Sequence, residues 1–379
     1  MKSFQNNFKV LHTVSSMNVK SGGTCSCIQY LLIGLINNHI DAEILTFESE
    51  NLVSGLPIRT IQRPKKSRFL ISNNFKRVLL SSKHQIFHTH GLWQYPSYIT
   101  AKVAKKRIIP YIVSPHGMLY PQALRKSGLQ KKTVFALSMK NGLNNAAAVH
   151  ATCMEEMQHL RNLGVKSPIA VISNAIKVQE VDFEEKTRYK FRIGYLGRIH
   201  RRKNIERLIY VWHQLGEMVN NCELVIIGAG DEIYYQFLKD EVKRLNLEGV
   251  VFTGFLSGTE KEKAINSLSY LVVPSDFENF GMIVPEALNQ GIPVIASKGT
   301  PWEELESHHC GWWVDNDVNT LSKTIETAIK IPEELRQQMG KNGKRLVTEN
   351  YTVGVVAKKM KRLYEWILNG GENPEFVYL

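Results

Sequence analysis

The chain repeats one pattern: a short apolar run, a loop rich in glycine or polar residues, and a stretch with helical periodicity. In the first half, the apolar runs that predict strands are 8–14, 42–47, 85–90, 111–114, 147–151 and 169–172. In the second half they are 191–197, 224–228, 250–253, 270–274 and 293–297. Strands that alternate with helices are typical of parallel sheets, so the sequence predicts an α/β protein with two parallel sheets.

The two series of elements are separated by a polar, charged segment at 177–190, which predicts a linker. We therefore expect one domain over 1–180 and a second over 190–354. A chain of 379 residues fits two domains of ordinary size, and its hydrophobic content of 43% argues against a disordered protein.

Other features of the composition indicate the cytoplasm. The longest apolar run, 28–36, is far shorter than the roughly 20 residues that a membrane span requires. Residues 1–10 lack the apolar core of a secretory signal. The five cysteines are scattered and odd in number, so reduced thiols are expected rather than disulfides or a zinc site.

The charge is distributed unevenly between the two halves. Residues 1–180 hold 23 Lys and Arg against 7 Asp and Glu, whereas the remainder holds 25 against 28. Residues 51–154 contain 17 basic residues and no acidic one. The first domain is therefore expected to have an anionic partner.

Two anionic partners suit such a domain, nucleic acid and a membrane surface. The sequence contains no zinc-finger spacing, RNP-like strand or clear helix-turn-helix, so no nucleic-acid partner is expected. Basic and bulky apolar residues are mixed over 64–80 and 124–143, a composition typical of helices that lie at a membrane interface. A helix that buries its apolar face in the core and exposes its basic face would give the same pattern. We expect peripheral association with the inner face of the cytoplasmic membrane.

The segment 275–298 carries the strongest signal for a binding site. It follows a predicted strand and contains two glutamates, Glu278 in the loop and Glu286 in the short helix after it. Ligands of open parallel sheets bind at this carboxyl edge of the strands. The backbone N–H groups expected to open the helix toward an anion or hydroxyl are those of Asn279, Phe280 and Gly281.

Further loops after predicted strands contain residues suited to binding a phosphate or a sugar. Gly22 and Gly23 follow the first strand, and adjacent glycines let a ligand approach the backbone closely. Arg198 and Lys203 follow the first strand of the second domain, where Asn204 is expected to cap the next helix.

Two loops of the first domain contain histidine. His116 lies in the loop Ser114–Met118, at the end of a predicted strand. One strand earlier, His90 and Trp93 occupy a similar loop and are weaker candidates for contact with a second substrate. Twelve histidines occur in the chain, and a single histidine is more often structural than functional.

These motifs together resemble the retaining glycosyltransferases of family 4 (group 1). The segment 275–298 is similar to their Glu-x7-Glu signature. The motifs Thr300–Glu303, Gly311–Trp313 and Ser114–Met118 resemble members that assemble bacterial surface polysaccharide. One departure is Ser173–Ile176, where the family usually has Pro-Asn-Gly.

The resemblance implies the GT-B fold, with two Rossmann-like domains of doubly wound parallel sheets that face each other across a cleft. It further implies that the C-terminal helix, within 355–379, crosses back and packs on the first domain.

The resemblance also implies roles for the motif residues. Glu278 and the backbone of 279–281 would hold the donor sugar, Glu286 the ribose, and Arg198 and Lys203 the pyrophosphate. Gly22 and Gly23 would lie near the donor phosphates, His116 near the donor sugar and the acceptor, and His90 and Trp93 near the acceptor. The residues expected to be catalytic are His116, Glu278, Arg198 and Lys203.

The implied reaction is retaining transfer of a hexose from a UDP- or GDP-sugar to a lipid-linked saccharide. The expected pathway is the synthesis of O-antigen, lipopolysaccharide, capsule or exopolysaccharide. No cofactor or metal is expected, because cations and helix dipoles replace the metal in GT-B enzymes; Asp315-Asn316-Asp317 is interpreted as an exposed loop. Two alternatives stay open: a GT-B phosphorylase or nucleotide-sugar epimerase, and a non-catalytic basic protein that binds membrane or nucleic acid.

Overall fold

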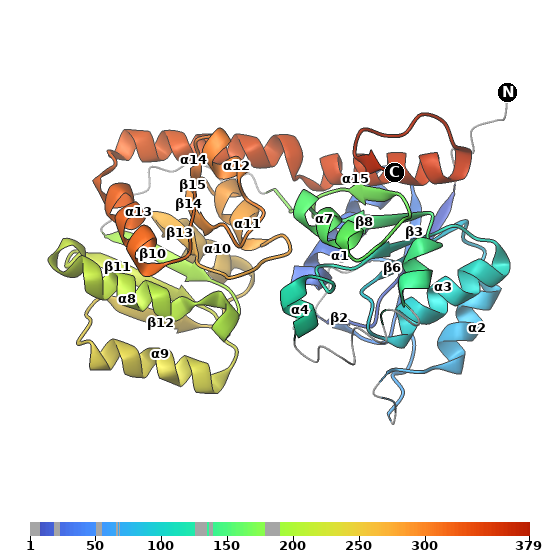
Figure 1. Ribbon diagram of the computed structural model, residues 1–379, viewed down its shortest axis with the longest axis horizontal. Helices are drawn as coiled ribbons and strands as arrows, with labels where there is room; N and C mark the ends of the chain where they lie inside the picture. The colour runs from blue at the N-terminus through green and yellow to red at the C-terminus, as the bar shows by residue number, and fades with distance from the viewer. Residues whose placement is uncertain are drawn as a thin grey trace. The chain divides into compact units, whose positions relative to one another are not determined.

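A computed structural model of the chain describes residues 8–18, 23–50, 55–65, 67, 69–125, 135, 139–178 and 190–379. The chain divides into two compact units (Figure 1). Unit 1 comprises Met1–Lys177 and Thr352–Leu379, and unit 2 comprises Val178–Tyr351. Most of the expected linker lies outside the described residues.

The core of unit 1 is an eight-stranded sheet in the order β5-β3-β1-β6-β7-β8-β9-β16. Its strands are β1 Lys9–Thr13, β3 Asp41–Thr46, β5 Ile58–Thr60, β6 Ile86–His90, β7 Tyr111–Ser114, β8 Ala148–Ala151, β9 Ile169–Val171 and β16 Val377–Tyr378. All described pairings are parallel except the one between β16 and β9. A separate pair joins β2 Met17–Asn18 to β4 Ser49–Glu50. The strand order reverses between β1 and β6, which makes this the switch point of a doubly wound sheet.

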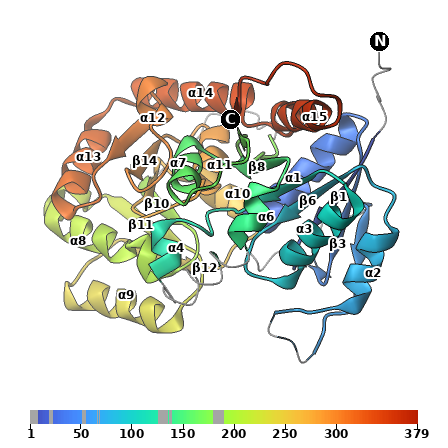
Figure 2. The same cartoon turned by 45° about the vertical axis from the view of Figure 1, so that its right-hand side comes forward.

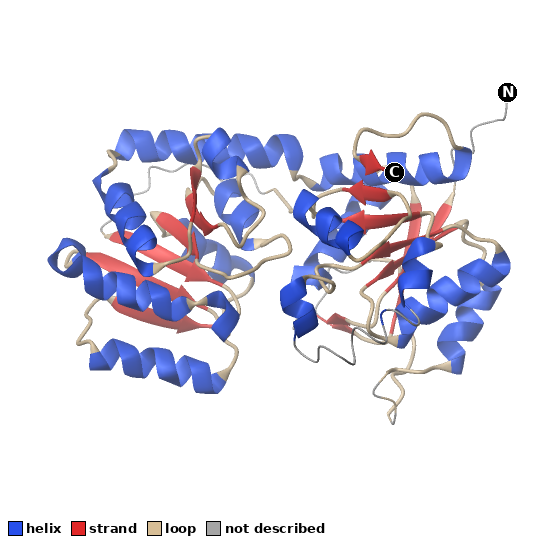
Figure 3. Cartoon of the chain, in the orientation of Figure 1, coloured by secondary structure: helices blue, strands red, loops and turns tan. Residues whose placement is uncertain are grey.

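Helices cover both faces of this sheet (Figure 3). They are α1 Gly23–Asn37, α2 Asn73–Ser81, α3 Tyr95–Arg107, α4 Pro121–Arg125, α6 Lys140–Asn144, α7 Met154–Asn162 and α15 Val353–Asn369. On one face, apolar side chains such as Leu11, Phe87 and Val113 form a core with residues of α2 and α3, which lie side by side (Figure 2). The C-terminal helix α15 packs against α1 within unit 1.

The opposite face of the sheet in unit 1 is unusual because its buried side chains include several polar ones. Side chains alternate between faces along a strand, so His88 and His90 of β6 project to the same side. His12 of β1 is in register with His88, and Ser114 of β7 is in register with His90. His150 of β8 is also buried, so a row of buried polar groups crosses the sheet near the carboxyl ends of its strands.

Unit 2 contains a six-stranded parallel sheet in the order β12-β11-β10-β13-β14-β15. Its strands are β10 Phe191–Leu196, β11 Cys222–Ile227, β12 Val250–Gly254, β13 Tyr270–Val273, β14 Val294–Ser297 and β15 Gly311–Val314. The order reverses between β10 and β13, so these neighbours form the switch point. The predicted pair of doubly wound α/β sheets is therefore confirmed.

The sheet of unit 2 is also covered on both faces. Its helices are α8 Ile205–Leu215, α9 Glu232–Arg244, α10 Gly258–Asn266, α11 Ile283–Asn289, α12 Glu304–Ser307, α13 Val318–Lys330 and α14 Glu333–Asn350. One core joins strand residues such as Ile193 and Ile226 to residues of α8, α9 and α13. On the other face, α11 packs against β13, β14 and α14.

The structure places the apolar residues of 64–80 in two different environments. Within this segment Phe75, Val78 and Leu79 of α2 are buried in the core, so most of the apolar face is not available to a membrane. Phe69 and Ile71 nevertheless remain exposed, at 63% and 58%. Most of 124–143 lies outside the described residues.

No helix among the described residues is both long and apolar enough to cross a membrane.

Candidate active site

The loops that follow β10 and β13 meet at the switch point of unit 2 and bring two predicted site residues together. Lys203, in the loop after β10, forms an ion pair with Glu278, which lies in the loop after β13. Ser275 supports the same carboxylate, because its hydroxyl donates to Glu278 Oε1 over 2.7 Å. The two charged side chains are only 24% and 14% exposed, so the pair is largely shielded from water. A cation and a carboxylate at this edge of the sheet suit a ligand that carries both phosphates and hydroxyl groups.

A second carboxylate, which the sequence analysis did not single out, organises the same loops. Asp276 Oδ1 accepts a hydrogen bond from Asn204 Nδ2 over 2.6 Å and lies 3.4 Å from the Arg207 guanidinium. Asn204 Nδ2 also donates to the Pro274 carbonyl. Asn204 stands at the expected N-cap position of α8, yet its side chain makes no capping bond and instead joins the two loops. The helix is opened in another way, since Ile205 N donates to the Tyr234 hydroxyl over 3.0 Å.

The backbone around Phe280 forms a tight turn rather than the first turn of a helix. The prediction that 279–281 open the helix is wrong, because α11 begins at Ile283. Gly281 has φ of +75°, a left-handed conformation that favours glycine and does not belong to a helix. Among the described residues, the N–H groups of Phe280 and Gly281 have no acceptor. The Phe280 carbonyl accepts from the buried indole of Trp302, which anchors the turn.

Glu286 lies inside α11, as predicted, and is 23% exposed. Its Oε2 is 2.6 Å from Lys261 Nζ of α10. The carboxylate is thus oriented by a cation that the sequence analysis did not identify, and it keeps the exposure that a ligand hydroxyl would need.

Arg198 is exposed and has no ion-pair partner among the described residues. Its loop is held by its neighbour in the sheet, because Gly197 N donates to Ile227 O and Ile199 N donates to Ala229 O. A Cβ on Gly228 would lie 1.9 Å from the Gly197 carbonyl oxygen, so only glycine permits this approach. The rigid loop leaves the guanidinium available for an anion.

The three residues of the Asp-Asn-Asp sequence at 315–317 have separate partners. Asp315 pairs with Lys298 over 3.1 Å, and Asp317 caps α13 by accepting from Thr320 N. Asn316 Nδ2 donates to the Pro274 carbonyl over 2.7 Å. Asn316 therefore belongs to the network around Asp276.

In unit 1, Gly23 is the first residue of α1 and is exposed, whereas Gly22 lies outside the described residues. Trp93 is partly buried and packs against the core of unit 1, next to the loop after β6.

His116 follows β7 in a left-handed conformation, with φ of +52°. The next residue is anchored by a buried carboxylate: Gly117 N donates to Glu156 Oε1 over 2.6 Å. The other oxygen of Glu156 accepts from Thr152 N over 2.8 Å. The sequence analysis missed Glu156, which holds the backbone beside His116 in place.

The His116 side chain contacts His90, which lies deeper in unit 1. Its Nε2 lies 2.9 Å from His90 Nδ1, and His90 is only 3% exposed. Burial lowers the pKa of His116 to about 3, so the imidazole is neutral at physiological pH. A cavity of about 10 Å³ adjoins His90, His116 and His150.

Comparison with family models identifies the protein's class. Residues 178–346 match the model described as glycosyl transferases group 1, and residues 27–175 match a glycosyl transferase 4-like domain. The chain belongs to the group 1 glycosyltransferases. Glu278, Glu286, Arg198 and Lys203 all lie within the group 1 match.

Similar proteins agree with this assignment. The uncharacterized glycosyltransferase MJ1607 of Methanocaldococcus jannaschii is 26% identical over 91% of this chain and 94% of its own. The capsular polysaccharide biosynthesis glycosyltransferase CapM of Staphylococcus aureus is 26% identical, over 48% of each chain.

Solved structures show the fold. Anabaena HepE in complex with UDP and glucose superposes with a TM-score of 0.77 and 17% identity, over 94% of this chain and 99% of HepE. Sucrose-phosphate synthase from Thermosynechococcus elongatus gives 0.77 and 19%, over 96% and 100%. The fold of this group 1 glycosyltransferase is GT-B, as predicted.

Proposed function

We propose that this glycosyltransferase moves a hexose from a UDP- or GDP-sugar to a lipid-linked saccharide, with retention of the anomeric configuration. The observation that carries the proposal is the meeting of Lys203 and Glu278 at the switch point of unit 2. Lys203 and the exposed Arg198 supply cations for a leaving diphosphate. Glu278 and the N–H groups of Phe280 and Gly281 supply acceptors and donors for sugar hydroxyls.

A nucleotide-sugar donor is supported by the neighbour HepE, whose structure contains UDP and glucose. Donor and acceptor are assigned to different units, with the nucleotide-sugar on unit 2 and the acceptor on unit 1. The acceptor hydroxyl then attacks on the face that the diphosphate leaves, with a phosphate oxygen as base. Because residues 51–154 contain no Asp or Glu, that part of unit 1 offers no carboxylate nucleophile for a double displacement.

The first experiment is a panel of UDP-, GDP- and ADP-sugars, with release of nucleoside diphosphate as the readout. We expect turnover of one donor that Glu278→Ala abolishes. Glu260→Ala is the matched control, because Glu260 is an exposed glutamate of α10 in the same unit. If no donor of the panel releases nucleoside diphosphate and none raises the melting temperature of the protein, a non-catalytic binding protein would be favoured.

Two further measurements test the remaining parts of the reaction. The anomeric proton of the first product, followed by NMR, is expected to keep the donor's configuration, and a covalent sugar on Glu278 or Asp276 would contradict the same-face route. Activity is expected to survive chelation; a loss that magnesium or manganese restores would contradict metal independence. Transfer to free phosphate, or epimerisation without an acceptor, would instead identify a phosphorylase or an epimerase.

We further propose that the acceptor belongs to the assembly of bacterial surface polysaccharide and that the protein works at the inner face of the cytoplasmic membrane. The partial match to CapM supports the pathway. The basic unit 1, with exposed Phe69 and Ile71, supports contact with anionic lipid rather than nucleic acid.

A further inference from the structure

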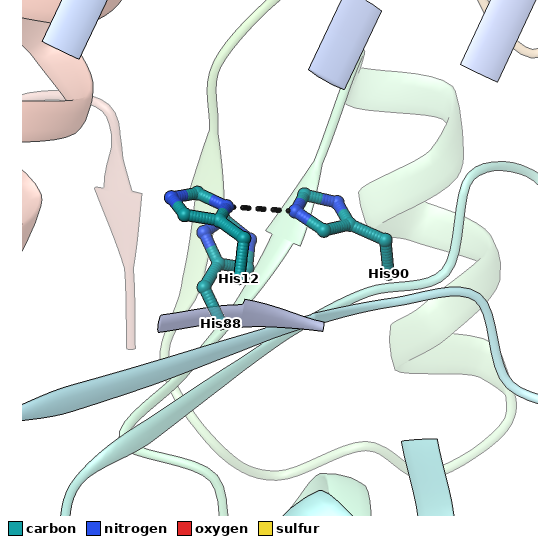
Figure 4. A group of neighbouring side chains, drawn as sticks. All are labelled: His12, His88 and His90. Atoms are coloured by element: carbon teal, nitrogen blue, oxygen red, sulfur yellow. Dashed lines mark hydrogen bonds between the residues drawn. The ribbon is translucent and has the colours of Figure 1, made fainter. Parts of the chain in front are cut away.

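Behind His116, a continuous chain of hydrogen bonds crosses unit 1. It contains five imidazoles, one serine hydroxyl and one phenol, and it ends on a backbone carbonyl. In order, its members are His116, His90, His12, Tyr364, His88, Ser114, His150 and the carbonyl of Ile172. Figure 4 shows His12, His88 and His90, with the bond between His12 and His90.

In this hydrogen-bond chain, the donor and the acceptor of every bond are set from one end, because the group at that end can only accept. His150 Nε2 lies 2.7 Å from the Ile172 carbonyl, which can only accept, so this nitrogen carries a proton. In a neutral ring the other nitrogen, Nδ1, is then an acceptor. Ser114 Oγ lies 2.8 Å from it and must donate its only proton there.

The same reasoning passes through the next ring. With its proton committed, Ser114 Oγ must accept, so His88 Nε2 donates to it over 2.7 Å. His88 Nδ1 is therefore an acceptor, and the Tyr364 hydroxyl donates to it over 2.8 Å.

The last steps lead to the surface. The Tyr364 hydroxyl has donated its proton, so its oxygen accepts from His12 Nε2 over 3.4 Å, the longest hydrogen bond in the series. The other tautomer of His12 would place two lone pairs against each other there. His12 Nδ1 then accepts from His90 Nε2 over 3.0 Å. His90 Nδ1 accepts from His116 Nε2 over 2.9 Å.

We propose that this chain holds His116 in the Nε2–H tautomer, with the lone pair of Nδ1 available to accept a hydrogen bond from a substrate hydroxyl. Tyr364, on the C-terminal helix, is the positioning residue that links the two halves of the chain. The substrate part rests on the proposed function; the tautomer does not. Among the described residues, His116 Nδ1 has no protein partner.

Burial keeps the rings of this hydrogen-bond chain neutral. His12, His88, His90 and His150 are each less than 5% exposed. Loss of hydration lowers the pKa of His12 to about 3 and that of His150 to about 4. The pKa values of His88 and His90 are also lowered well below the usual range, first by burial and then by neighbouring histidines.

A metal ion is the rival explanation for this group, since ligand atoms of His12, His88 and His90 lie within 4.8 Å of one another. Tetrahedral zinc would separate two imidazole nitrogens by about 3.3 Å, given bonds near 2.0–2.1 Å. His12 Nδ1 and His90 Nε2 are 3.0 Å apart, which suits a direct hydrogen bond. Every ring nitrogen of the three already has a partner.

The test is ¹⁵N NMR of the full-length protein labelled at histidine, because long-range ¹⁵N–¹H couplings distinguish the two neutral tautomers. The His116→Gln variant assigns the His116 signals. We expect the Nε2–H tautomer for His116 near pH 7, without donor or acceptor present. The Nδ1–H tautomer, an imidazolium, or one equivalent of bound zinc in the purified protein would each overturn the proposal.

A variant tests the coupling. In Tyr364→Phe the link between His88 and His12 is lost, so His116 is expected to become a mixture of tautomers while His150 keeps Nε2–H. Tyr111→Phe is the matched control: its buried hydroxyl donates to the Gly142 carbonyl, outside the chain. A His116 tautomer that Tyr364→Phe leaves unchanged would overturn the coupling. Should that variant fail to fold, Ser114→Ala gives the same comparison.

Activity supplies a separate readout. With the donor identified, Tyr364→Phe is expected to lower kcat about 5- to 50-fold with little change in the donor KM, whereas Tyr111→Phe changes neither. An unchanged kcat beside an altered tautomer would overturn the functional part of the proposal. If no donor is turned over while the predicted tautomer is found, the proposed function fails and the hydrogen-bond chain stands.

Discussion

At the scale of single residues, the two charges assigned to different parts of the donor neutralise each other in this structure. Lys203 pairs with Glu278, and Ser275 holds the same carboxylate oxygen. A diphosphate must therefore compete with Glu278 for Lys203, whereas Arg198 is exposed and needs no such exchange. Within the pair, each side chain orients the other.

The first prediction concerns these cations. Lys203→Gln and Arg198→Gln are each expected to weaken binding of the nucleoside diphosphate about 10- to 100-fold, since a charged hydrogen bond contributes about 1.5–3 kcal/mol. Isothermal titration calorimetry with the nucleoside diphosphate of the active donor measures the change in dissociation constant. Lys323→Gln, an exposed lysine of α13, is the control. Unchanged affinity in both site variants would contradict the assignment.

The second prediction concerns Gly299, where the loop containing Asp276 approaches the backbone. A Cβ there would lie 2.4 Å from the Asp276 carbonyl oxygen, and Glu278 N donates to the Gly299 carbonyl over 2.8 Å. Gly299→Ala is expected to lower the free energy of unfolding by about 1–3 kcal/mol, because backbone must move.

Urea unfolding measures this loss. Gly354→Ala is the control, because no atom lies within 4 Å of its added Cβ, and alanine in α15 is expected to stabilise by about 0.5–1 kcal/mol. Equal unfolding free energies of Gly299→Ala and the wild type would contradict this prediction, because the loop would then accommodate the Cβ without cost.

At the scale of elements, the sequence predicted most of both sheets because buried parallel strands are continuous apolar runs. The prediction for 111–114 matches β7 to the residue. The short edge strands β5, β15 and β16 were missed. Ile58–Thr60 and Val377–Tyr378 have little apolar length of their own, and the apolar Gly311–Val314 was interpreted only as a family motif. The start of α11 was also misplaced, because the turn before it is anchored by a hydrogen bond from the Trp302 indole to the Phe280 carbonyl, which lies far away in sequence.

The histidine chain could not be predicted from local sequence. Its members come from four strands, a loop and the C-terminal helix, and only the register brings His12 opposite His88. One signal was present: His88 and His90 alternate within a strand and therefore project to one face. The alternation of His88 and His90 favours a polar face on the buried strand. His90 was instead interpreted by itself, as a possible contact with the acceptor.

The third prediction is a loss of stability of unit 1 in mild acid. In the unfolded chain histidine binds a proton below a pKa near 6.5, whereas burial lowers the pKa of His12 to about 3 and that of His150 to about 4. The pKa values of the buried His88 and His90 are also lowered. Between the unfolded and the folded pKa values, the unfolded state binds more protons. Stability is therefore complete above pH 6.5 and falls below it, by up to about 1.4 kcal/mol per pH unit for each buried histidine.

Hydrogen exchange, corrected for its intrinsic pH dependence, measures this loss strand by strand. Amides of β1, β6, β7 and β8 are expected to lose protection between pH 6.5 and 4.5 before those of β10 to β14. The described histidines of unit 2 are not buried, so its strands are the internal control. Equal loss in both units would contradict the account.

At the scale of the whole molecule, charge is divided between the units. The basic excess of residues 1–180 was visible in the sequence, but which apolar residues remain exposed was not. Packing buries most of the apolar face of α2 and leaves Phe69 and Ile71 exposed, a few residues before the exposed Lys76 and Arg77 in the sequence. Four such residues suit the surface of an anionic membrane.

The fourth prediction is binding to anionic vesicles. The protein is expected to co-sediment with phosphatidylglycerol-rich vesicles at low salt and to dissociate near 0.5 M salt, because screening weakens each contact. The double variant Phe69→Ser, Ile71→Ser is expected to bind several-fold less. Phe255→Ser, a 69% exposed phenylalanine of unit 2, is the control. Equal binding to neutral vesicles would contradict an electrostatic association.

The central claim is that Glu278 acts on the donor in a glycosyl transfer. Its most direct test is kcat/KM of the wild type, Glu278→Gln and Glu260→Gln with the active donor. Removing a group that acts on the transition state is expected to lower kcat/KM about 100- to 1000-fold, while the control stays within two-fold. A Glu278→Gln enzyme within a few-fold of the wild type would contradict the account.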